Sequence, residues 1–422
     1  MQPSPAAVAY RRIVRDDVPT GSGIGLEAIR AAVESGAPIV KRTPVLSSIT
    51  MGALVGGTIA LKAENLQRTG AFKVRGALHR LHRLGSDADV GVTAGSAGNH
   101  AQALALAAAH HGVPCEIFVP EGAPLAKIAA CEGYGATVTE AGASLTEAVA
   151  ASMAHAARTG AAFCHPYDDP DVIAGQGTLG LELAEDVDDL AAVLVPLGGG
   201  GLLAGVATAL RALRPEVRIV GVQAAVCAPY AGDPPPSGPV PTLADGIAVK
   251  SPGAITRPIV ERLVDDVVTV DEDTIADAML LLSERAKLVV EGAGAVGIAA
   301  LLSGAVTPAP TGVTCVVLSG GNVDLGSMPS LILRHETRAG RRITVFVRID
   351  DRPGGLARLL GVCASVGANV IDVQHVREGV DLHVRETGLR ATFEIRNAKH
   401  GRDLVAGIAA AGYPVAVDAF GG

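Results

Sequence analysis

Aromatic residues are scarce in this sequence, which has no tryptophan, six phenylalanines and five tyrosines among 422 residues. Hydrophobic residues nevertheless make up 49% of the chain, and there are 52 glycines. Small and aliphatic side chains of this kind let helices pack closely against parallel strands that are buried on both faces. We therefore expect an α/β protein, long enough for two or three hydrophobic cores.

Basic clusters and long apolar runs are also missing. The 35 Lys and Arg residues against 43 Asp and Glu give a formal net charge of −8, so the chain lacks the electrostatic footprint of a nucleic-acid-binding protein. No uninterrupted apolar run approaches the roughly 18 residues that a membrane span needs, and the first residues lack the apolar segment of a signal peptide. We expect neither nucleic acid nor a membrane as a partner.

The cysteines show no CxxC spacing, so neither a zinc site nor a disulfide framework is indicated. The six of them are Cys115, Cys131, Cys164, Cys227, Cys315 and Cys363. We therefore expect a protein of the reducing cytoplasm with no metal site.

Short β-branched runs alternate with stretches of helical length from about residue 58 onward, which indicates βαβ units around parallel sheets. Helices are expected at 73–84, 99–111, 124–133 and, as one long element, at 273–289, and a Pro-rich exposed loop at 228–241. A charged stretch at 333–342 separates two differently patterned regions. We place a domain boundary there, giving residues 1–335, with a smaller subdomain at about 55–160, and residues 336–422.

The C-terminal region predicts the order βαββαβ of a small ferredoxin-like α+β domain. Its strands are expected at 342–349, 369–378, 389–396 and 413–419, and its helices from Pro353 and at 399–411.

Four consecutive glycines follow the apolar strand "VLVPL" and precede an amphipathic helix. Their backbone N–H groups and the positive end of the helix dipole suit a phosphate, although a flexible connection is the plainer interpretation. The absence of a following GK[ST] excludes a nucleoside-triphosphate P-loop.

A second glycine set, Gly292, Gly294 and Gly297, has the GxGxxG spacing of a dinucleotide fingerprint. The fingerprint also requires an acidic residue about 20 positions later, and 298–323 contains no Asp or Glu. We interpret these glycines as sites of close helix packing and keep an NAD-binding dehydrogenase as the rival from another class.

Lys73 lies in the apolar stretch "TGAFKVRGA" and is therefore either a snorkelling or a reactive lysine. With a phosphate at the glycine loop, pyridoxal phosphate held by Lys73 as a Schiff base becomes the candidate cofactor. Ser96 starts a turn that could take a substrate carboxylate, and Ser319 follows a predicted parallel strand at the end where α/β sheets bind ligands.

Eight stretches together resemble the threonine dehydratases, pyridoxal-phosphate enzymes of the tryptophan-synthase-β-like fold. They are "KRTPVLSS" (41–48), "LKAENLQRTGAFKVRGA" (61–77), "GSAGNHAQA" (95–103), "HPYDDPDVIAGQGTLGLEL" (165–183), "GGGGL" (198–202), "LADGIAV" (243–249), "VVEGAGA" (289–295) and "LSGGNVD" (318–324). The C-terminal region, with "DRPGGLARLL" and "GANVIDVQHVR", resembles an ACT domain. The resemblance implies two open parallel-sheet subdomains followed by a regulatory ACT-like domain.

The resemblance also implies roles for individual residues. Lys73 would be the Schiff-base lysine, Phe72 would pack on the cofactor ring, Asn99 would meet the ring hydroxyl, and Ser319 would face the ring nitrogen. The phosphate would be held by Gly198, Gly199, Gly200, Gly201 and Leu202, with Gly246 as a further cofactor contact. The substrate loop would consist of Ser96, Ala97, Gly98, Asn99 and His100. Glu291, which we expect at the end of a helix, has a supporting role.

The implied reaction removes the β-hydroxyl of threonine or serine and yields 2-oxobutanoate or pyruvate with ammonia. A serine racemase is the alternative, but racemases of this fold carry a serine at the position of Ala97, and alanine cannot transfer a proton. The stretch 221–229 also lacks the carboxylate of the racemases' metal site. Ala71 replaces a serine that the family usually has, which should weaken one hydrogen bond at most.

For the C-terminal domain, we expect amino-acid sensing. Gly354 and Gly355 at a helix start would receive the carboxylate of an effector, with isoleucine or valine favoured by analogy, and Asn369 would take its amine side. The alternative is that this domain only builds a homodimer or homotetramer.

Overall fold

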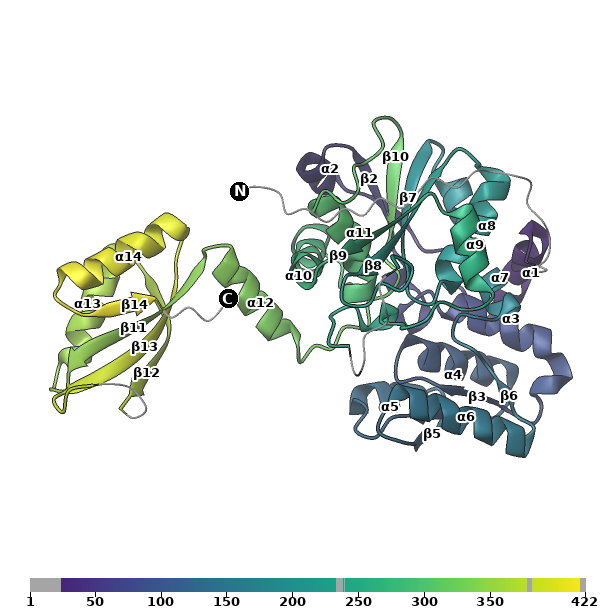
Figure 1. Ribbon diagram of the computed structural model, residues 1–422, viewed down its shortest axis with the longest axis horizontal. Coiled ribbons are helices and arrows are strands. Elements are labelled where there is room, and N and C mark those ends of the chain that lie inside the picture. Colours follow the sequence, from purple (N-terminus) through teal and green to yellow (C-terminus); the bar gives the residue numbers. More distant parts are fainter. Residues whose placement is uncertain (1–23, 233–237, 239, 378–381, 418–422) are drawn as a thin grey trace. The chain divides into compact units, whose positions relative to one another are not determined.

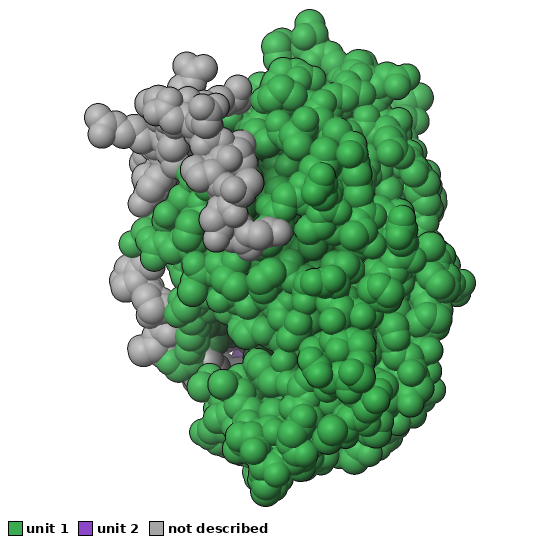
Figure 2. Space-filling view, turned by 90° about the vertical axis from the view of Figure 1, so that its right-hand side faces the viewer, with its two compact units in different colours: residues 1–323 green, residues 324–422 purple. Residues whose placement is uncertain are grey.

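The chain divides into two compact units, residues 1–323 and 324–422, which Figure 2 colours green and purple. The structure, a computed structural model, describes residues 24–232, 238, 240–377 and 382–417. Helix α12 (Met328–Arg338) belongs to the second unit and packs against its first strand. The division thus falls earlier in the chain than the boundary at 335/336 that the sequence suggests.

The larger sheet of the first unit has six strands in the order β1-β2-β10-β7-β8-β9 (Figure 1). All neighbours are parallel except β1 and β2. The strands are β1 (Val45–Ser47), β2 (Thr58–Lys62), β7 (Leu190–Pro196), β8 (Arg218–Ala224), β9 (Asp266–Val270) and β10 (Val313–Val317). The central strands are almost wholly buried, as expected for a parallel sheet covered on both faces.

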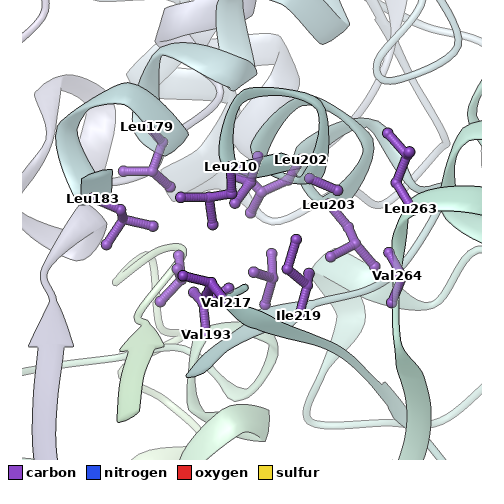
Figure 3. Close-up of a cluster of buried hydrophobic side chains, with 14 of the residues drawn as sticks. Leu179, Leu183, Val193, Leu202, Leu203, Leu210, Val217, Ile219, Leu263 and Val264 are labelled. Atoms are coloured by element: carbon purple, nitrogen blue, oxygen red, sulfur yellow. The ribbon is translucent and has the colours of Figure 1, made fainter. Parts of the chain in front are cut away.

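Helices cover both faces of this sheet. Figure 3 shows leucines of α7 (Pro170–Asp186) and α8 (Gly201–Leu213) packed with Val193 of β7 and Ile219 of β8, beside the end of α9 (Thr256–Leu263). The next residue in β7, Leu194, points to the opposite face, where α11 (Gly292–Leu302) lies. α10 (Glu272–Leu281) packs on α11.

Glycines bring the helices of the first unit unusually close together. A Cβ on Gly175 in α7 would lie 2.6 Å from the Arg75 carbonyl oxygen in α3 (Val74–Leu84), and one on Gly205 in α8 would lie 2.6 Å from the Gly177 backbone nitrogen. A larger side chain at either position would force the helices apart. This close packing accounts for a core built with so few aromatic residues.

The smaller sheet of the first unit has four parallel strands in the order β5-β4-β3-β6. The strands are β3 (Val92–Gly95), β4 (Cys115–Val119), β5 (Thr137–Glu140) and β6 (Ala162–Phe163), and the helices around them are α3 (Val74–Leu84), α4 (Asn99–His111), α5 (Leu125–Glu132) and α6 (Leu145–Thr159). β2 also falls within the predicted subdomain at 55–160 but pairs in the larger sheet. Helix α1 (Leu26–Gly36) precedes all the strands in the chain, and α2 (Ile49–Val55) lies between β1 and β2.

The second unit is a ferredoxin-like sandwich with the strand order β12-β13-β11-β14, all antiparallel. Its elements are β11 (Arg342–Asp350), α13 (Gly355–Val366), β12 (Asn369–Val376), β13 (Glu386–Glu394), α14 (Ala398–Ala410) and β14 (Val415–Val417). The predicted βαββαβ order is confirmed, as is the α/β class of the first unit with its two open parallel sheets. Helix α13 starts at Gly355 and not at Pro353, because Gly354 is left-handed with φ 84°.

Two further predictions differ from the structure. The helix expected at 273–289 ends earlier: α10 stops at Leu281, a π-helical turn follows at Leu282–Ala286, and Lys287 adopts a left-handed φ of 60°. The loop expected at 228–241 lies partly outside the described residues, and its first residues are buried or half-buried. In the described part of the chain, no helix combines the length and the hydropathy that crossing a membrane requires.

Candidate active site

The segment that carries Lys73 is fastened to the residues that follow β10. Ala71 forms an antiparallel bridge with Gly320, the Phe72 N–H donates to the Ser319 carbonyl at 3.1 Å, and the Gly321 N–H donates to the Gly70 carbonyl at 2.8 Å. Gly70 is left-handed (φ 71°), which turns the chain into this pairing. The predicted site residues Phe72, Lys73 and Ser319 are therefore neighbours, although about 250 positions separate the two segments.

Lys73 occupies the N-cap of α3, and its side chain turns inward. Its Nζ donates to the Pro166 carbonyl at 2.7 Å and lies 5.3 Å from the centre of the Phe72 ring. Burial disfavours the charged form and lowers the pKa of Lys73 to about 8, although the nearby Glu291 opposes this. The lowered pKa raises the fraction of Lys73 in the neutral form, which is the form that nucleophilic chemistry requires.

The four glycines form a tight turn between β7 and α8. Gly200 has φ 100°, and a Cβ on Gly201 would lie 2.9 Å from the Tyr167 carbonyl oxygen. A Cβ on Gly199 would run into the Tyr167 ring, and one on Gly198 would lie 2.9 Å from the Ile247 Cα. Side chains are therefore excluded throughout the turn, which leaves its backbone as the surface that a ligand could meet.

The N–H groups at the start of α8 are available to an anion. The first helical hydrogen bond runs from the Ala204 N–H to the Gly200 carbonyl (2.8 Å), so the amides of Gly201, Leu202 and Leu203 precede it and point out of the helix end. The Gly199 carbonyl is turned away from this end, because it accepts from Thr256 Oγ1 (2.6 Å) and Tyr230 Oη (3.3 Å).

The predicted substrate loop, 96–100, connects β3 to α4. Ser96 Oγ accepts from the Gly98 N–H at 3.3 Å, and Asn99 is the first residue of α4. His100 is buried, with its Nε2 2.9 Å from the Cys164 carbonyl, and burial together with the charge of Lys73 lowers its pKa to about 3. A histidine with this pKa stays neutral at physiological pH and cannot relay protons.

Asn99 is joined to two residues from distant parts of the first unit. Its Nδ2 donates to Glu291 Oε1 at 2.7 Å, and its Oδ1 accepts from Asn322 Nδ2 at 2.8 Å. Burial raises the pKa of Glu291 to about 7. Glu291 is the N-cap of α11, so its predicted place at the end of a helix is wrong: the preceding helical segment has already ended at Ala286.

Gly246 lies beside this group of residues. A Cβ on it would come within 3.5 Å of Glu291 Oε1, and its neighbour Ile247 packs on Gly198. The structure thus links Gly246, in the 3₁₀ turn Asp245–Ile247, both to the glycine turn and to Glu291.

The glycines of the GxGxxG-like stretch pack as predicted. A Cβ on Gly294 would lie 2.8 Å from the Gly320 carbonyl oxygen. One on Gly297 would collide with the Val316 side chain, and one on Gly292 would collide with the Leu243 carbonyl. Their helix-packing interpretation is therefore confirmed.

The predicted effector residues lie in the second unit. Gly354 is the N-cap of α13, and a Cβ on Gly355 would lie 2.8 Å from the Asp350 carbonyl oxygen. Asn369, at the exposed start of β12, already donates to Glu394 Oε2 at 3.0 Å.

Sequence reasoning missed several residues that shape the site. Asp168, within the stretch 165–183, accepts from three backbone N–H groups at the start of α9: Ala254 and Ile255 at 2.8 Å and Thr256 at 3.1 Å. Tyr230 and Thr256 brace the glycine turn, and Asn322 holds Asn99. Of these, only Asp168 and Asn322 lie within motifs that the sequence singles out.

The comparisons with known proteins agree with this geometry. The sequence profile of the family described as pyridoxal-phosphate dependent enzyme matches residues 37–320. An L-threonine ammonia-lyase from Thermotoga maritima is 42% identical over 400 residues, which cover 93% of this chain and 99% of that protein.

Two solved structures share the fold of the first unit. A threonine deaminase from T.th. matches with a TM-score of 0.67 and 41% identity, over 71% of this chain and 99% of its own. Maize serine racemase matches with a TM-score of 0.69 and 37% identity, over 74% and 98%. The predicted tryptophan-synthase-β-like fold is thereby confirmed. Because the family profile spans more than half of the sequence, the chain belongs to the pyridoxal-phosphate dependent enzymes, with pyridoxal phosphate as its cofactor.

Proposed function

We propose that the protein is a threonine ammonia-lyase, which eliminates the β-hydroxyl of L-threonine, and also of L-serine, to give 2-oxobutanoate or pyruvate and ammonia. The observation that carries the proposal is the inward-turned amine of Lys73, with its pKa near 8, on a segment fastened to Ser319 and Gly320. The similarity to the Thermotoga maritima L-threonine ammonia-lyase extends over nearly the whole chain and supports the same reaction.

The residues present fit the cofactor. The turn from Gly198 to Leu202 offers backbone N–H groups and a helix N-terminus to the phosphate. Lys73 would hold the aldehyde carbon, with Phe72 against the ring, Asn99 at the ring hydroxyl and Gly246 beside it. Ser319 is 2% exposed and would meet the ring nitrogen with a neutral hydroxyl.

When bound, the cofactor withdraws electrons from the α-carbon of an amino acid attached to it. The Nζ of Lys73 would then take the proton from that carbon, for which a largely neutral amine is required. A serine hydroxyl at the ring nitrogen cannot protonate the ring as an aspartate would, which favours loss of the β-hydroxyl over transamination.

The loop from Ser96 to His100 would bind the carboxylate of the substrate. It ends at the N-terminus of α4, where backbone N–H groups lack helical acceptors, and His100 is too strongly held to compete for the proton. Ala97 contributes no titratable group on its side of the substrate.

The test is to measure 2-oxo acid formation from L-threonine and L-serine with the cofactor-loaded protein. Lys73→Ala should abolish turnover, whereas Lys287→Ala, which changes an exposed lysine, should leave it intact. The proposal would be refuted if Lys73→Ala retained turnover, or if the wild type formed no 2-oxo acid from L-threonine and none from L-serine.

A serine racemase is the second candidate, favoured by the similarity to the maize enzyme. Because Ala97 cannot exchange a proton, we expect little D-serine. Among the described residues there is also no cluster of His, Cys, Asp and Glu that could hold a metal ion. Chiral chromatography of L-serine incubations decides between elimination and racemisation.

For the second unit we propose an ACT-like regulatory role, with the first unit as the catalytic part of the chain. An amino acid such as isoleucine or valine would bind at Gly354 and Gly355, where α13 begins. Asn369 would reach it only by releasing Glu394. Titration with each branched-chain amino acid, followed by calorimetry and by activity, tests this role; binding of none would leave only assembly.

We further propose that the enzyme is a cytoplasmic homodimer or homotetramer. All six cysteines are free and buried, which is typical of a reducing compartment. Sedimentation equilibrium measures the subunit number directly.

A further inference from the structure

Three side chains and one backbone carbonyl form a continuous chain of hydrogen bonds in the site. Asn322 Nδ2 donates to the Thr69 carbonyl at 2.7 Å and to Asn99 Oδ1 at 2.8 Å, and Asn99 Nδ2 donates to Glu291 Oε1 at 2.7 Å. The chain joins residues from four separate parts of the first unit.

The direction of these bonds follows from the carbonyl at their end. A backbone carbonyl accepts hydrogen bonds and never donates, so Asn322 must turn its NH₂ group, and not its oxygen, toward Thr69. Both N–H groups of that amide are then used, and the partner atom on Asn99 must be an oxygen. The Asn99 NH₂ group consequently faces Glu291, and one of its two N–H groups remains for a ligand.

The Thr69 carbonyl is itself held in place by the local backbone. Thr69 has φ 59°, a left-handed conformation that is unusual for a β-branched residue, and Gly70 follows with φ 71°. A side chain on Gly70 would collide with the Asn322 amide. This turn therefore aims the carbonyl at Asn322 and lets the amide approach.

We propose that Asn322 and Glu291 are positioning residues that lock the Asn99 amide, so that it offers an N–H and not its carbonyl to an anionic oxygen of the bound cofactor. The inference rests on the proposed function, in which Asn99 meets the ring hydroxyl. In the opposite orientation, Asn99 would lose its side-chain hydrogen bonds to Asn322 and Glu291. Its Oδ1 would then face the anionic oxygen of the cofactor.

The electrostatic surroundings allow a clean test. The charged groups Asp245, Lys127 and Lys73 act on Glu291, and Asp245 pairs with Lys127 at 3.2 Å. None of them needs to be changed, because Asn322 is uncharged. A variant at Asn322 alters the orientation of Asn99 while the local charges stay as they are.

The experiment compares Asn322→Ala with the wild type, both loaded with pyridoxal phosphate. The visible absorbance of the cofactor is followed across pH, and its dissociation constant is measured by equilibrium dialysis. A hydrogen bond to the anionic form of an acid lowers its pKa, so losing the donor should move the spectral midpoint upward by about one pH unit, roughly tenfold in the ionisation constant. Cofactor binding should weaken as well.

Asn65→Ala is the matched control. Asn65 is a buried asparagine whose Nδ2 likewise donates to a backbone carbonyl, that of Val289 at 3.0 Å, and it lies outside the chain of bonds to Asn99. Its spectral midpoint should match that of the wild type. If Asn322→Ala does not fold, Asn322→Leu, which is uncharged, similar in volume and has no side-chain N–H, replaces it, with Asn65→Leu as its control.

An unchanged midpoint in the Asn322 variant, or an equal shift in the Asn65 variant, would overturn this inference and leave the proposed function untouched. Conversely, suppose that the spectral midpoint is shifted in the Asn322 variant but the cofactor-loaded wild type forms no 2-oxo acid. That result would refute the threonine reaction alone. A wild type that binds no pyridoxal phosphate would overturn both.

Discussion

Arg75 and Glu64 form a bidentate ion pair inside the first unit, with Nε to Oε2 and Nη2 to Oε1 both at 2.8 Å. Neither side chain is more than 1% exposed, and the other edge of the guanidinium meets Glu182 at 2.7 Å. Arg75 lies two residues beyond Lys73, in the first turn of α3. The ion pair therefore holds in place the helix whose N-cap is Lys73.

Removing this arginine should be costly. Arg75→Ala leaves buried carboxylates without a partner and should lower the free energy of unfolding by about 3–5 kcal/mol. Arg75→Lys should lower it less, since an ammonium cannot bind both carboxylate oxygens. Urea denaturation measures both, and Arg257→Ala, at an exposed ion pair with Glu261, provides the control. A loss no larger than that of the control would contradict the role assigned to the pair.

The same pair predicts a sensitivity to acid. Burial alone would raise the pKa of Glu64, but the charge and hydrogen bonds of Arg75 lower it below its ordinary value. The ionised carboxylate thus stabilises the fold above its unfolded pKa, and this contribution is lost as pH falls through the lower folded pKa. Stability measured from about pH 6 to about pH 3 should fall more steeply in the wild type than in Glu64→Gln. Parallel curves would show that Glu64 does not titrate as described.

Cofactor capture should depend on pH through Lys73. Only the neutral amine attacks an aldehyde, and the pKa of Lys73 is lowered to about 8. The rate at which cofactor-free protein develops visible absorbance with pyridoxal phosphate should rise roughly tenfold per pH unit below about 8 and level off above it. Stopped-flow absorbance measures this rate. A plateau reached only near the pKa of an ordinary lysine would contradict the assigned environment.

The cap provided by Asp168 should link helix stability to cofactor binding. Asp168→Ala removes the acceptor for three N–H groups of α9 and should cost about 1–2 kcal/mol. Thr256 also donates from its Oγ1 to the Gly199 carbonyl in the glycine turn. Without the cap, we expect this hydrogen bond to weaken and cofactor affinity to fall as well.

Asp271→Ala is the matched variant for this test. Asp271 caps α10 by accepting from the Thr274 N–H at 2.7 Å, away from the glycine turn. It should cost similar stability without changing the cofactor dissociation constant, as measured by fluorescence titration. Equal effects of the two variants on that constant would show that the cap does not support the turn.

The secondary structure could be predicted where the determinants are local. Helix α4 runs over the predicted 99–111, because Gly98 and Gly112 flank a continuous alanine-rich stretch. The end of α10 was not predictable in this way, since the apolar pattern continues while Lys287 takes a left-handed conformation. Helix α13 likewise starts later than its proline suggests, because Gly354 breaks the helical path.

The motifs contain the residues that we propose to face the ligand, but only some of those that support them. Lys73, Asn99 and Ser319 stand in recognisable stretches, and the structure brings them together. The contacts of Tyr230 with the Gly199 carbonyl, and of Asn322 with Thr69, join loops that are distant in sequence. No periodicity or spacing encodes such pairings, since they depend on how the loops fold over the ends of the strands.

The pairing of Ala71 with Gly320 has a consequence for biosynthesis. A nascent chain exposes Lys73 long before residues 319–322 leave the ribosome, and until then the lysine segment has no partner strand to hold it. The segment that carries Lys73 can therefore take its final conformation only when almost the whole first unit has been translated.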